Sequence, residues 1–137
     1  LRRARNSLVS IIPTSTGAAR AVGEVLPQLK GKIDGSAIRV PTANVSLVDF
    51  KFVSKKKTDE NELIKIFKDG ELKELNSILQ TTSDPVVSPD LNHNSHSSII
   101  DLSEIKVLNG KFCRILSWYD NEWGFSNRLL DVSKKMI

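Results

Sequence analysis

The sequence predicts an α+β fold, a mixed and largely antiparallel sheet with helices on one face. Apolar and polar residues alternate over most of Val45–Ser54, the pattern of a strand. Asn109-Gly110 separates two further strand-like runs and is typical of a tight hairpin turn. Apolar residues recur at helical spacing in the segments 18–29, 59–67 and 121–132. We expect these elements to form one domain over residues 1–137.

Composition excludes several classes of protein. The 137 residues are 39% hydrophobic and 26% charged, as in ordinary globular chains. No apolar run approaches the roughly 20 residues of a membrane span. One cysteine excludes an internal disulfide framework and fits a reducing compartment. The net charge of +4 gathers in Arg2–Arg5 and Lys55–Lys57, which we interpret as solvated surface. The basic start without an initiator methionine leads us to expect a piece of a longer protein.

The stretch Ile11–Ala21 combines hydroxyl residues, a glycine and a helical pattern. We expect a helix to begin near Gly17 or Ala18, with Ser15 or Thr16 as its N-cap. The first turn of a helix has unpaired N–H groups and a partial positive charge, which suit a phosphate or carboxylate. The same residues also fit an ordinary capped helix, and the local sequence leaves both interpretations open.

Arginines surround this stretch in sequence. Arg2, Arg3 and Arg5 lie in Leu1–Ser7, which we interpret as a loop. Either they are solvated or one of them folds back onto the same anion, which a guanidinium suits. Arg39 lies in an apolar strand-like run, Ser36–Thr42, where it must snorkel, pair with a carboxylate or meet a ligand. Pro41 cannot donate a ladder hydrogen bond, so this strand should end there or lie at an edge.

The middle of the chain shows the periodicity of core helices and no candidate catalytic or binding residue. Thr58 is the expected cap of a helix that begins at Asp59 and ends at Asp69-Gly70. A second short helix is expected over Glu71–Ile78. The polar, turn-rich segment Gln80–Ser98 is expected to be a loop.

Three side chains with reactive potential have simpler interpretations. His93 and His96 have no third ligand at a motif spacing, so we favour a surface loop and expect no metal site. Cys113 falls in the middle of a predicted strand with nothing nearby to lower its pKa, which favours an inert core thiol over a nucleophile.

The C-terminal third is predicted to hold three strands and a helix. The strands are Ser97–Leu102, Glu104–Leu108 and Lys111–Tyr119, and the helix is capped by Asp120 or Asn121. Aromatic and polar side chains crowd the corner between the last strand and this helix. Polar groups at the end of a strand often form a site.

Four segments in this order resemble the catalytic domain of the glyceraldehyde-3-phosphate dehydrogenase family. They are Arg-Arg-Ala-Arg at 2–5, Ile-Ile-Pro-Thr-Ser-Thr-Gly-Ala-Ala at 11–19, Arg-Val-Pro-Thr-Ala-Asn-Val-Ser-Leu-Val-Asp at 39–49 and Ser-Trp-Tyr-Asp-Asn-Glu-Trp-Gly-Phe-Ser at 117–126. The resemblance implies an NAD-dependent, phosphorylating dehydrogenase of glycolysis that works as a cytoplasmic homotetramer. It also implies that residues 1–137 are the later part of the catalytic domain, with the C-terminal helix from about residue 121.

The resemblance also implies which parts of the enzyme lie elsewhere. The Gly-x-Gly-x-x-Gly turn, the Ser-Cys-Thr-Thr segment with the nucleophile and the His-x-Tyr-Thr segment with the base do not occur in these residues. Cys113, His93 and His96 do not occupy those positions. We therefore expect no catalytic residue in this chain and no dehydrogenase activity from it alone.

Six residues receive a role from the resemblance. Thr16 and Gly17 would hold the attacking inorganic phosphate, with Arg3 as the charged partner. Arg39 would be shared between this phosphate and the phosphate of glyceraldehyde 3-phosphate. Asn121 would bond the nicotinamide carboxamide and so select the ring face that takes hydride.

The sixth residue, Phe125, stands where many family members have a tyrosine against the nicotinamide. Ring stacking survives this change, whereas any role of the hydroxyl is lost.

Two alternatives remain open at this point. The segment Asn92–His96 resembles a loop of erythrose-4-phosphate dehydrogenase, although Ser15-Thr16-Gly17 favours the glyceraldehyde enzyme. The other alternative is not an enzyme: a non-catalytic module that binds polyanions through Arg2–Arg5 and Lys55–Lys57. We expect neither a membrane nor a nucleic acid as partner.

Overall fold

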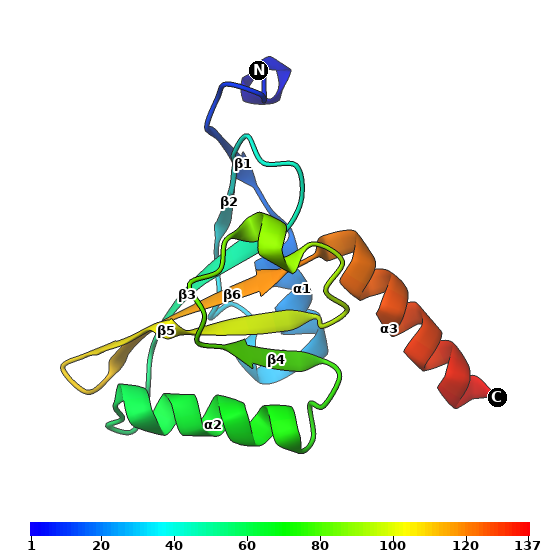
Figure 1. Cartoon of the computed structure of the whole chain (residues 1–137). Coiled ribbons are helices and arrows are strands. Elements are labelled where there is room, and N and C mark those ends of the chain that lie inside the picture. The colour runs from blue at the N-terminus through cyan, green and yellow to red at the C-terminus, as the bar shows by residue number, and fades with distance from the viewer. The chain divides into compact units, whose positions relative to one another are not determined.

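The computed structural model describes all 137 residues and divides into two compact units, Leu1–Thr42 and Ala43–Ile137. Figure 1 labels the helices and strands of both units.

The first unit is a two-stranded antiparallel sheet with one helix. Its elements are the 3-10 turn η1 (Arg2–Ala4), β1 (Ile12–Ser15), α1 (Ala18–Val25), the 3-10 turn η2 (Pro27–Leu29) and β2 (Ser36–Arg39). In the register of the pair, Ile12 lies opposite Arg39 and Thr14 lies opposite Ala37. Strand β2 ends before Pro41, which confirms the boundary expected from the proline.

Helix α1 begins at Ala18, as predicted, but its N-cap differs from the prediction. The cap residue is Gly17, not Ser15 or Thr16. The Thr16 hydroxyl still accepts a hydrogen bond from the Ala18 N–H at 3.2 Å. Thr16 therefore satisfies one first-turn donor from just outside the helix.

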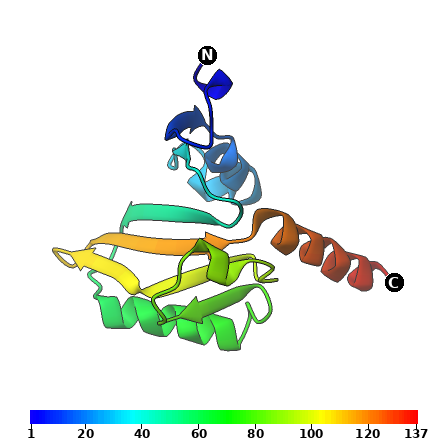
Figure 2. The same ribbon diagram turned by 45° about the horizontal axis from the view of Figure 1, so that its top comes forward.

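The second unit contains a four-stranded sheet in the order β3-β6-β5-β4. Its elements are β3 (Ser46–Val53), α2 (Glu60–Leu72), β4 (Leu79–Thr82), the 3-10 turn η3 (Ser88–Leu91), β5 (Ser98–Leu108), β6 (Phe112–Tyr119) and α3 (Asn121–Met136). β6 pairs antiparallel with β3 and β5, and β4 pairs parallel with β5. Helix α2 packs along β4 and β5 (Figures 1 and 2). The mixed, largely antiparallel α+β fold is confirmed.

The core of this unit lies between α2 and the sheet. Its buried members come from α2, β4, β5 and β6: Leu63, Leu79, Ile100, Leu102, Ile105, Cys113 and Ile115. Cys113 is fully buried in this cluster, which confirms that it is a core thiol. A smaller cluster joins Val45, Leu91 and Ile99.

Both ends of α2 differ from the prediction. The N-cap is Asp59, whose carboxylate accepts a hydrogen bond from the Glu62 N–H at 2.9 Å. Thr58 instead donates its hydroxyl to the Glu62 side chain at 2.8 Å. At the other end, the helix continues through Gly70 to Leu72.

The segment after α2 was predicted wrongly. Residues 73–78 form turns instead of the second helix expected over Glu71–Ile78. Strand β4, Leu79–Thr82, occupies the start of the segment expected to be a loop. Its partner in β5 is parallel and distant in sequence, so no local turn signal marks the strand.

The hairpin of β5 and β6 follows the prediction at its turn but not along its first strand. Asn109 and Gly110 have φ angles of 52° and 66°, as a primed two-residue turn requires. β5 is one strand, Ser98–Leu108, instead of two. Its pairing is irregular between Asp101 and Lys106, and the Asp101 carboxylate accepts the Ser103 N–H and hydroxyl there.

Strand β3 alternates apolar and polar residues as predicted, but its apolar side chains are more exposed than the prediction of a half-buried strand implies. Phe52 packs against the core, while Val48 and Phe50 are 44% and 40% exposed. β3 is an edge strand of the sheet, and α2 covers β4 and β5 instead. An apolar edge therefore remains accessible in this chain.

Candidate functional site

Arginines from both ends of the first unit converge on one pocket. The pocket has a volume of about 320 Å³ and is lined by Arg3, Arg5, Ser7, Ile12, Thr14 and Arg39. The strand register explains this arrangement, because cross-strand neighbours point to the same face of a sheet. Ile12 lies opposite Arg39 and Thr14 lies two residues further along, so all three share that face.

The pocket carries positive charge that no acid in the unit neutralises. Residues 1–42 contain seven basic and two acidic side chains, a net charge of +5. Neither acid lines the pocket, and the ion pairs of the chain do not involve Arg3, Arg5 or Arg39. Guanidinium groups recognise phosphate through two parallel hydrogen bonds, so this pocket suits a phosphate chemically.

The Thr14 hydroxyl adds a polar group to this wall. Its oxygen is buried and has no hydrogen-bond partner in the protein. A buried hydroxyl without a partner costs about 1–3 kcal/mol, so this position favours a ligand or water that can bond it.

Thr16 and Gly17 do not line the arginine pocket. They precede α1, just past the end of β1, and a Cβ built on Gly17 would meet nothing within 4 Å. The structure thus brings Arg3 and Arg39 together, whereas the Thr16–Gly17 turn stands outside that wall. The sequence interpretation gave Arg5 no individual role and missed Thr14. The two-residue period of β1 is the signal that would have placed Thr14 beside Arg39.

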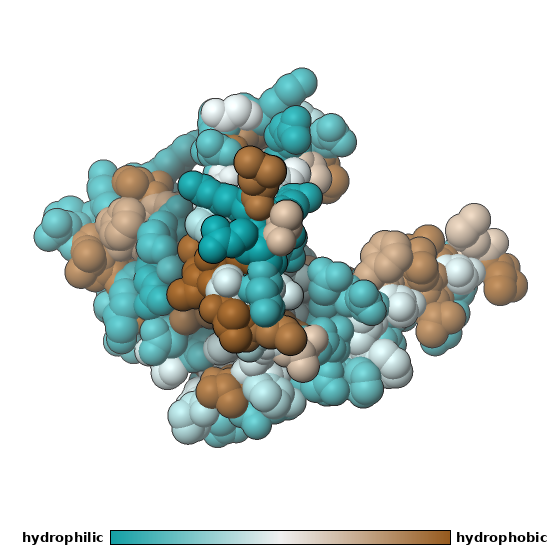
Figure 3. Space-filling model, turned by 90° about the horizontal axis from the view of Figure 1, so that it is seen from above, coloured by the Kyte–Doolittle hydropathy of each residue, from teal (hydrophilic) through white to brown (hydrophobic).

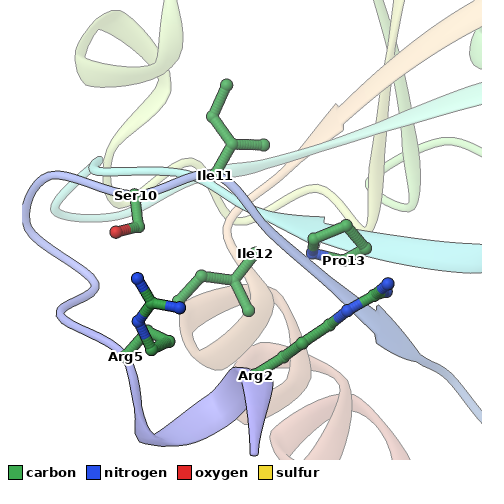
Figure 4. A pocket seen from close by; sticks show the side chains of 6 residues that line it. All are labelled: Arg2, Arg5, Ser10, Ile11, Ile12 and Pro13. Carbon is green, nitrogen blue, oxygen red and sulfur yellow. The ribbon is translucent and has the colours of Figure 1, made fainter.

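A second, smaller pocket of about 210 Å³ adjoins the same segment. Arg2, Arg5, Ser10, Ile11, Ile12 and Pro13 line it (Figure 4). In Figure 4 the Arg5 guanidinium lies near Ser10 and that of Arg2 extends toward Pro13. Arg5 and Ile12 line both pockets.

In the second unit, the corner between β6 and α3 is organised by Asp120. This carboxylate is 2% exposed. Its Oδ1 accepts the Trp123 N–H at 3.1 Å, which makes Asp120 the N-cap of α3. Its Oδ2 accepts the Asn44 amide and the His93 N–H, each at 2.9 Å. The prediction that Asp120 or Asn121 caps this helix is confirmed for Asp120.

These hydrogen bonds decide the charge of Asp120. Burial by itself would raise the pKa of the Asp120 carboxyl. The hydrogen bonds from His93, Trp123 and Asn44 outweigh burial and hold this pKa below its ordinary value. Asp120 is therefore ionised at neutral pH in spite of its burial.

Asn121 and Phe125, the two residues assigned to the nicotinamide, lie on the exposed first turns of α3. Phe125 is 64% exposed. Their positions in the helix differ by four, so they share one helix face. Neither residue lines the pocket of about 210 Å³ at this corner, whose walls are Asn44, His93, Asp120, Glu122, Trp123 and Ser126. An amide and an aromatic ring on one face fit a planar carboxamide-bearing ring in their chemistry.

Two further contacts fix the start of α3. Gly124 is buried, and a Cβ at this position would lie 3.3 Å from the His96 carbonyl oxygen. Arg128 donates to the Ser77 carbonyl at 3.0 Å and to the Ser97 hydroxyl at 3.2 Å. Beyond this point α3 extends away from the four-stranded sheet (Figures 1 and 2).

The two histidines have structural partners. The His93 ring packs on Trp123 with centroids 4.7 Å apart, and His96 Nδ1 lies 2.8 Å from the Asn94 side-chain oxygen. No group of three His, Cys, Asp or Glu side chains is arranged to hold a metal ion. None of the helices is long and apolar enough to cross a membrane.

Comparison with known proteins agrees with this architecture. Residues 1–121 match the family model described as glyceraldehyde 3-phosphate dehydrogenase, C-terminal domain. The chain is 53% identical to the glyceraldehyde-3-phosphate dehydrogenase of Xanthobacter flavus over 136 residues, which cover 99% of this chain and 41% of that protein. It is 52% identical to the enzyme of Borreliella burgdorferi over 139 residues, which cover 100% of this chain and 42% of the relative. The chain thus spans about two fifths of the length of these curated relatives and belongs to the glyceraldehyde-3-phosphate dehydrogenase family, as a C-terminal domain.

Proposed function

We propose that this chain supplies the phosphate-binding and nicotinamide-orienting residues of an NAD-dependent, phosphorylating glyceraldehyde-3-phosphate dehydrogenase of glycolysis. The enzyme would work as a cytoplasmic homotetramer. Its nucleophile and base would come from residues outside 1–137. The substrates of the proposed reaction are glyceraldehyde 3-phosphate and inorganic phosphate.

The observation that carries the proposal is the convergence of Arg3 and Arg39 on one pocket without an acidic partner. Two phosphates take part in the proposed reaction, and two guanidinium groups can hold them by charge-assisted hydrogen bonds. In the proposal, Thr16 and Gly17 contribute the hydroxyl and the backbone N–H of the inorganic phosphate site. The open space beside Gly17 supports this role, because an anion could approach its backbone.

The cofactor role rests on the first turns of α3. Asn121 would bond the carboxamide of NAD and Phe125 would pack against its ring. NAD, when bound, supplies the hydride acceptor. The residues of this chain would orient that ring and select its reactive face.

The test is a kinetic comparison in the protein that carries these residues. Arg3→Ala and Arg39→Ala should each raise the KM for glyceraldehyde 3-phosphate or inorganic phosphate about tenfold or more, as expected for one charge-assisted hydrogen bond. Arg20→Ala is the matched control, because Arg20 is an exposed arginine of α1 outside the pocket. Equal, small effects of all three changes would contradict the proposal.

The same kinetic assay also distinguishes between the two candidate substrates, glyceraldehyde 3-phosphate and erythrose 4-phosphate. The proposal expects a higher kcat/KM for glyceraldehyde 3-phosphate than for erythrose 4-phosphate. The opposite order would assign the chain to the erythrose-4-phosphate enzyme instead.

A further inference from the structure

We infer that Asp120 is a positioning residue for the cofactor: its buried carboxylate fixes the first turn of α3 and thereby orients the Asn121 amide. The inference rests on the proposed function, in which Asn121 bonds the nicotinamide carboxamide. Asp120 itself would not touch the reacting atoms.

The carboxylate joins three segments that are far apart in sequence. Asn44 lies just before β3, His93 follows η3, and Trp123 is in the first turn of α3. Each donates one hydrogen bond to Asp120, at 2.9, 2.9 and 3.1 Å. Asn44 also donates to the Asn92 side chain at 2.7 Å, so the segment before β3 is tied to the segment after η3. The start of α3 is therefore held from two directions.

The backbone of His93 shows how much this arrangement constrains the chain. His93 has φ of 61°, a left-handed conformation that costs free energy for a residue other than glycine. Its N–H bonds Asp120, and its ring packs on Trp123 of the same helix turn. Both contacts of this strained residue thus stabilise the first turn of α3.

An ordinary N-cap does not need this network. Asp59 caps α2 through a single contact with the Glu62 N–H at 2.9 Å, and its side chain is exposed. Asp120 makes the equivalent contact through Oδ1 and uses Oδ2 for two donors outside the helix. The second oxygen fixes the direction in which α3 leaves the sheet. Asn121 is the next residue in this turn, so the direction of the helix sets the orientation of the Asn121 amide.

The test uses Asp120→Asn in the protein that carries these residues. Asparagine keeps a carbonyl oxygen for the Trp123 N–H, but its NH₂ group cannot accept from Asn44 and His93. The KM for NAD should rise about tenfold, the effect of one lost hydrogen bond to a charged group, while the KM for glyceraldehyde 3-phosphate stays within about twofold. Hydride transfer should lose face specificity, measured as deuterium at both C4 positions of NADH from deuterated aldehyde.

Asp59→Asn is the matched control, because it changes a helix cap that is remote from Asn121 in sequence and topology. It should leave the KM for NAD and the labelled C4 position as in the wild type. If Asp120→Asn behaves like Asp59→Asn, the inference is wrong. If Asp120→Asn does not fold, Asn44→Ala replaces it in the test. This variant keeps Asp120 and its N-cap hydrogen bond with the Trp123 N–H. Asn44→Ala should raise the KM for NAD by about threefold, because a neutral donor contributes less.

Asn121→Ala separates this inference from the proposed function. If Asn121→Ala leaves the KM for NAD and the labelled position unchanged, the proposed role of Asn121 is wrong. If Asn121→Ala alters both, while Asp120→Asn and Asn44→Ala alter neither, only the positioning role of Asp120 is overturned.

Discussion

Thr14 and Arg39 lie on one face of the β1–β2 pair, because Ile12 is opposite Arg39 and Thr14 is opposite Ala37. The face they share forms part of the arginine pocket. Thr14 brings a buried hydroxyl without a partner, and Arg39 brings a charge without a counterion in the first unit. The Thr14 hydroxyl has lost water and gained no protein partner, which is a cost unless a ligand meets it. Arg39 is exposed and has no ion-pair partner that would compete with an anion.

Thr14→Val tests this relationship. Valine keeps the shape of threonine and removes the unpaired hydroxyl, so the free energy of unfolding of the phosphate-free chain should rise by about 1 kcal/mol. Thr16→Val is the contrasting change, because the Thr16 hydroxyl accepts the Ala18 N–H. It should lower the free energy of unfolding by about 1 kcal/mol. Urea titration measures both, and a large loss of stability in Thr14→Val would show that the hydroxyl has a partner.

Arg39→Ala should weaken phosphate binding to the chain about ten- to hundred-fold, the effect of one charge-assisted hydrogen bond of about 1.5–3 kcal/mol. Arg39→Lys should weaken it less, because lysine keeps the charge and loses the fork. Phosphate titration followed by NMR at the Thr14 amide, which lies in the pocket wall, measures the affinity, with Arg20→Ala as the control. The Gly17 and Ala18 amides report whether the Thr16–Gly17 turn binds the same phosphate. Amide shifts that do not move at any of these residues up to high phosphate would contradict a phosphate site shared by Arg39 and this turn.

Gly110→Ala should destabilise the β5–β6 hairpin. Gly110 has φ of 66°, which costs an L-residue about 1–2 kcal/mol. Gly35→Ala is the control, because a Cβ there meets nothing within 4 Å and φ is not in the left-handed region. Thermal unfolding should show a lower midpoint for Gly110→Ala alone. Equal midpoints for the two variants would mean that the turn tolerates a side chain.

The elements predicted correctly carry their signal locally. Asn109-Gly110 specifies its own turn, and the run that begins at Ala18 shows its period within eight residues. Strand β4 was missed because Leu79–Thr82 is short and polar and pairs with a strand that comes later in the sequence. A local pattern cannot report such a partner.

The candidate site likewise has a part that the sequence predicted and a part that only the structure shows. Family resemblance pointed to Arg3 and Arg39, and the structure places both in one pocket. The network around Asp120 could not be read from the sequence, because Asn44 and His93 reach it only after folding. Asp120 by itself looks like a helix cap, and the buried second oxygen is a property of the tertiary structure.

Stability should depend on pH through Asp120 and Asp49. Hydrogen bonds lower the pKa of Asp120, and the hydrogen bond from Lys51, aided by Arg114, lowers that of Asp49. The folded state thus binds these protons less readily than the unfolded state, whose carboxyl pKa is about 3.9. Both contributions are fully present above about pH 5 and are lost progressively as the pH falls through about 3.9 toward the lowered pKa values of the folded state. Urea titrations from pH 6 downward, on the order of 0.5 pH steps, measure this dependence.

Asp120→Asn removes one of the carboxyl groups whose pKa is lowered in the folded state. Its free energy of unfolding should therefore fall less steeply below about pH 4 than that of the wild type. Parallel curves for the two proteins would show that Asp120 has the same pKa in the folded and unfolded states.

The isolated chain should associate with itself through α3. Four apolar residues follow each other at helical spacing along this helix and are more than half exposed: Phe125, Leu129, Val132 and Met136. Figure 3 shows apolar side chains gathered along α3. The edge strand β3 adds a second exposed apolar surface. Large exposed apolar patches drive association, so we expect a dimer or a higher oligomer.

Leu129→Lys should weaken this association about tenfold or more, since burial of one leucine side chain contributes about 1.5–3 kcal/mol. Ser133→Lys adds the same charge one turn further along α3 and should weaken it less. Sedimentation velocity over a range of concentrations measures both variants. A wild-type chain that remains monomeric at micromolar concentration would contradict the prediction, and equal effects of the two lysines would attribute the association to charge instead of the apolar stripe.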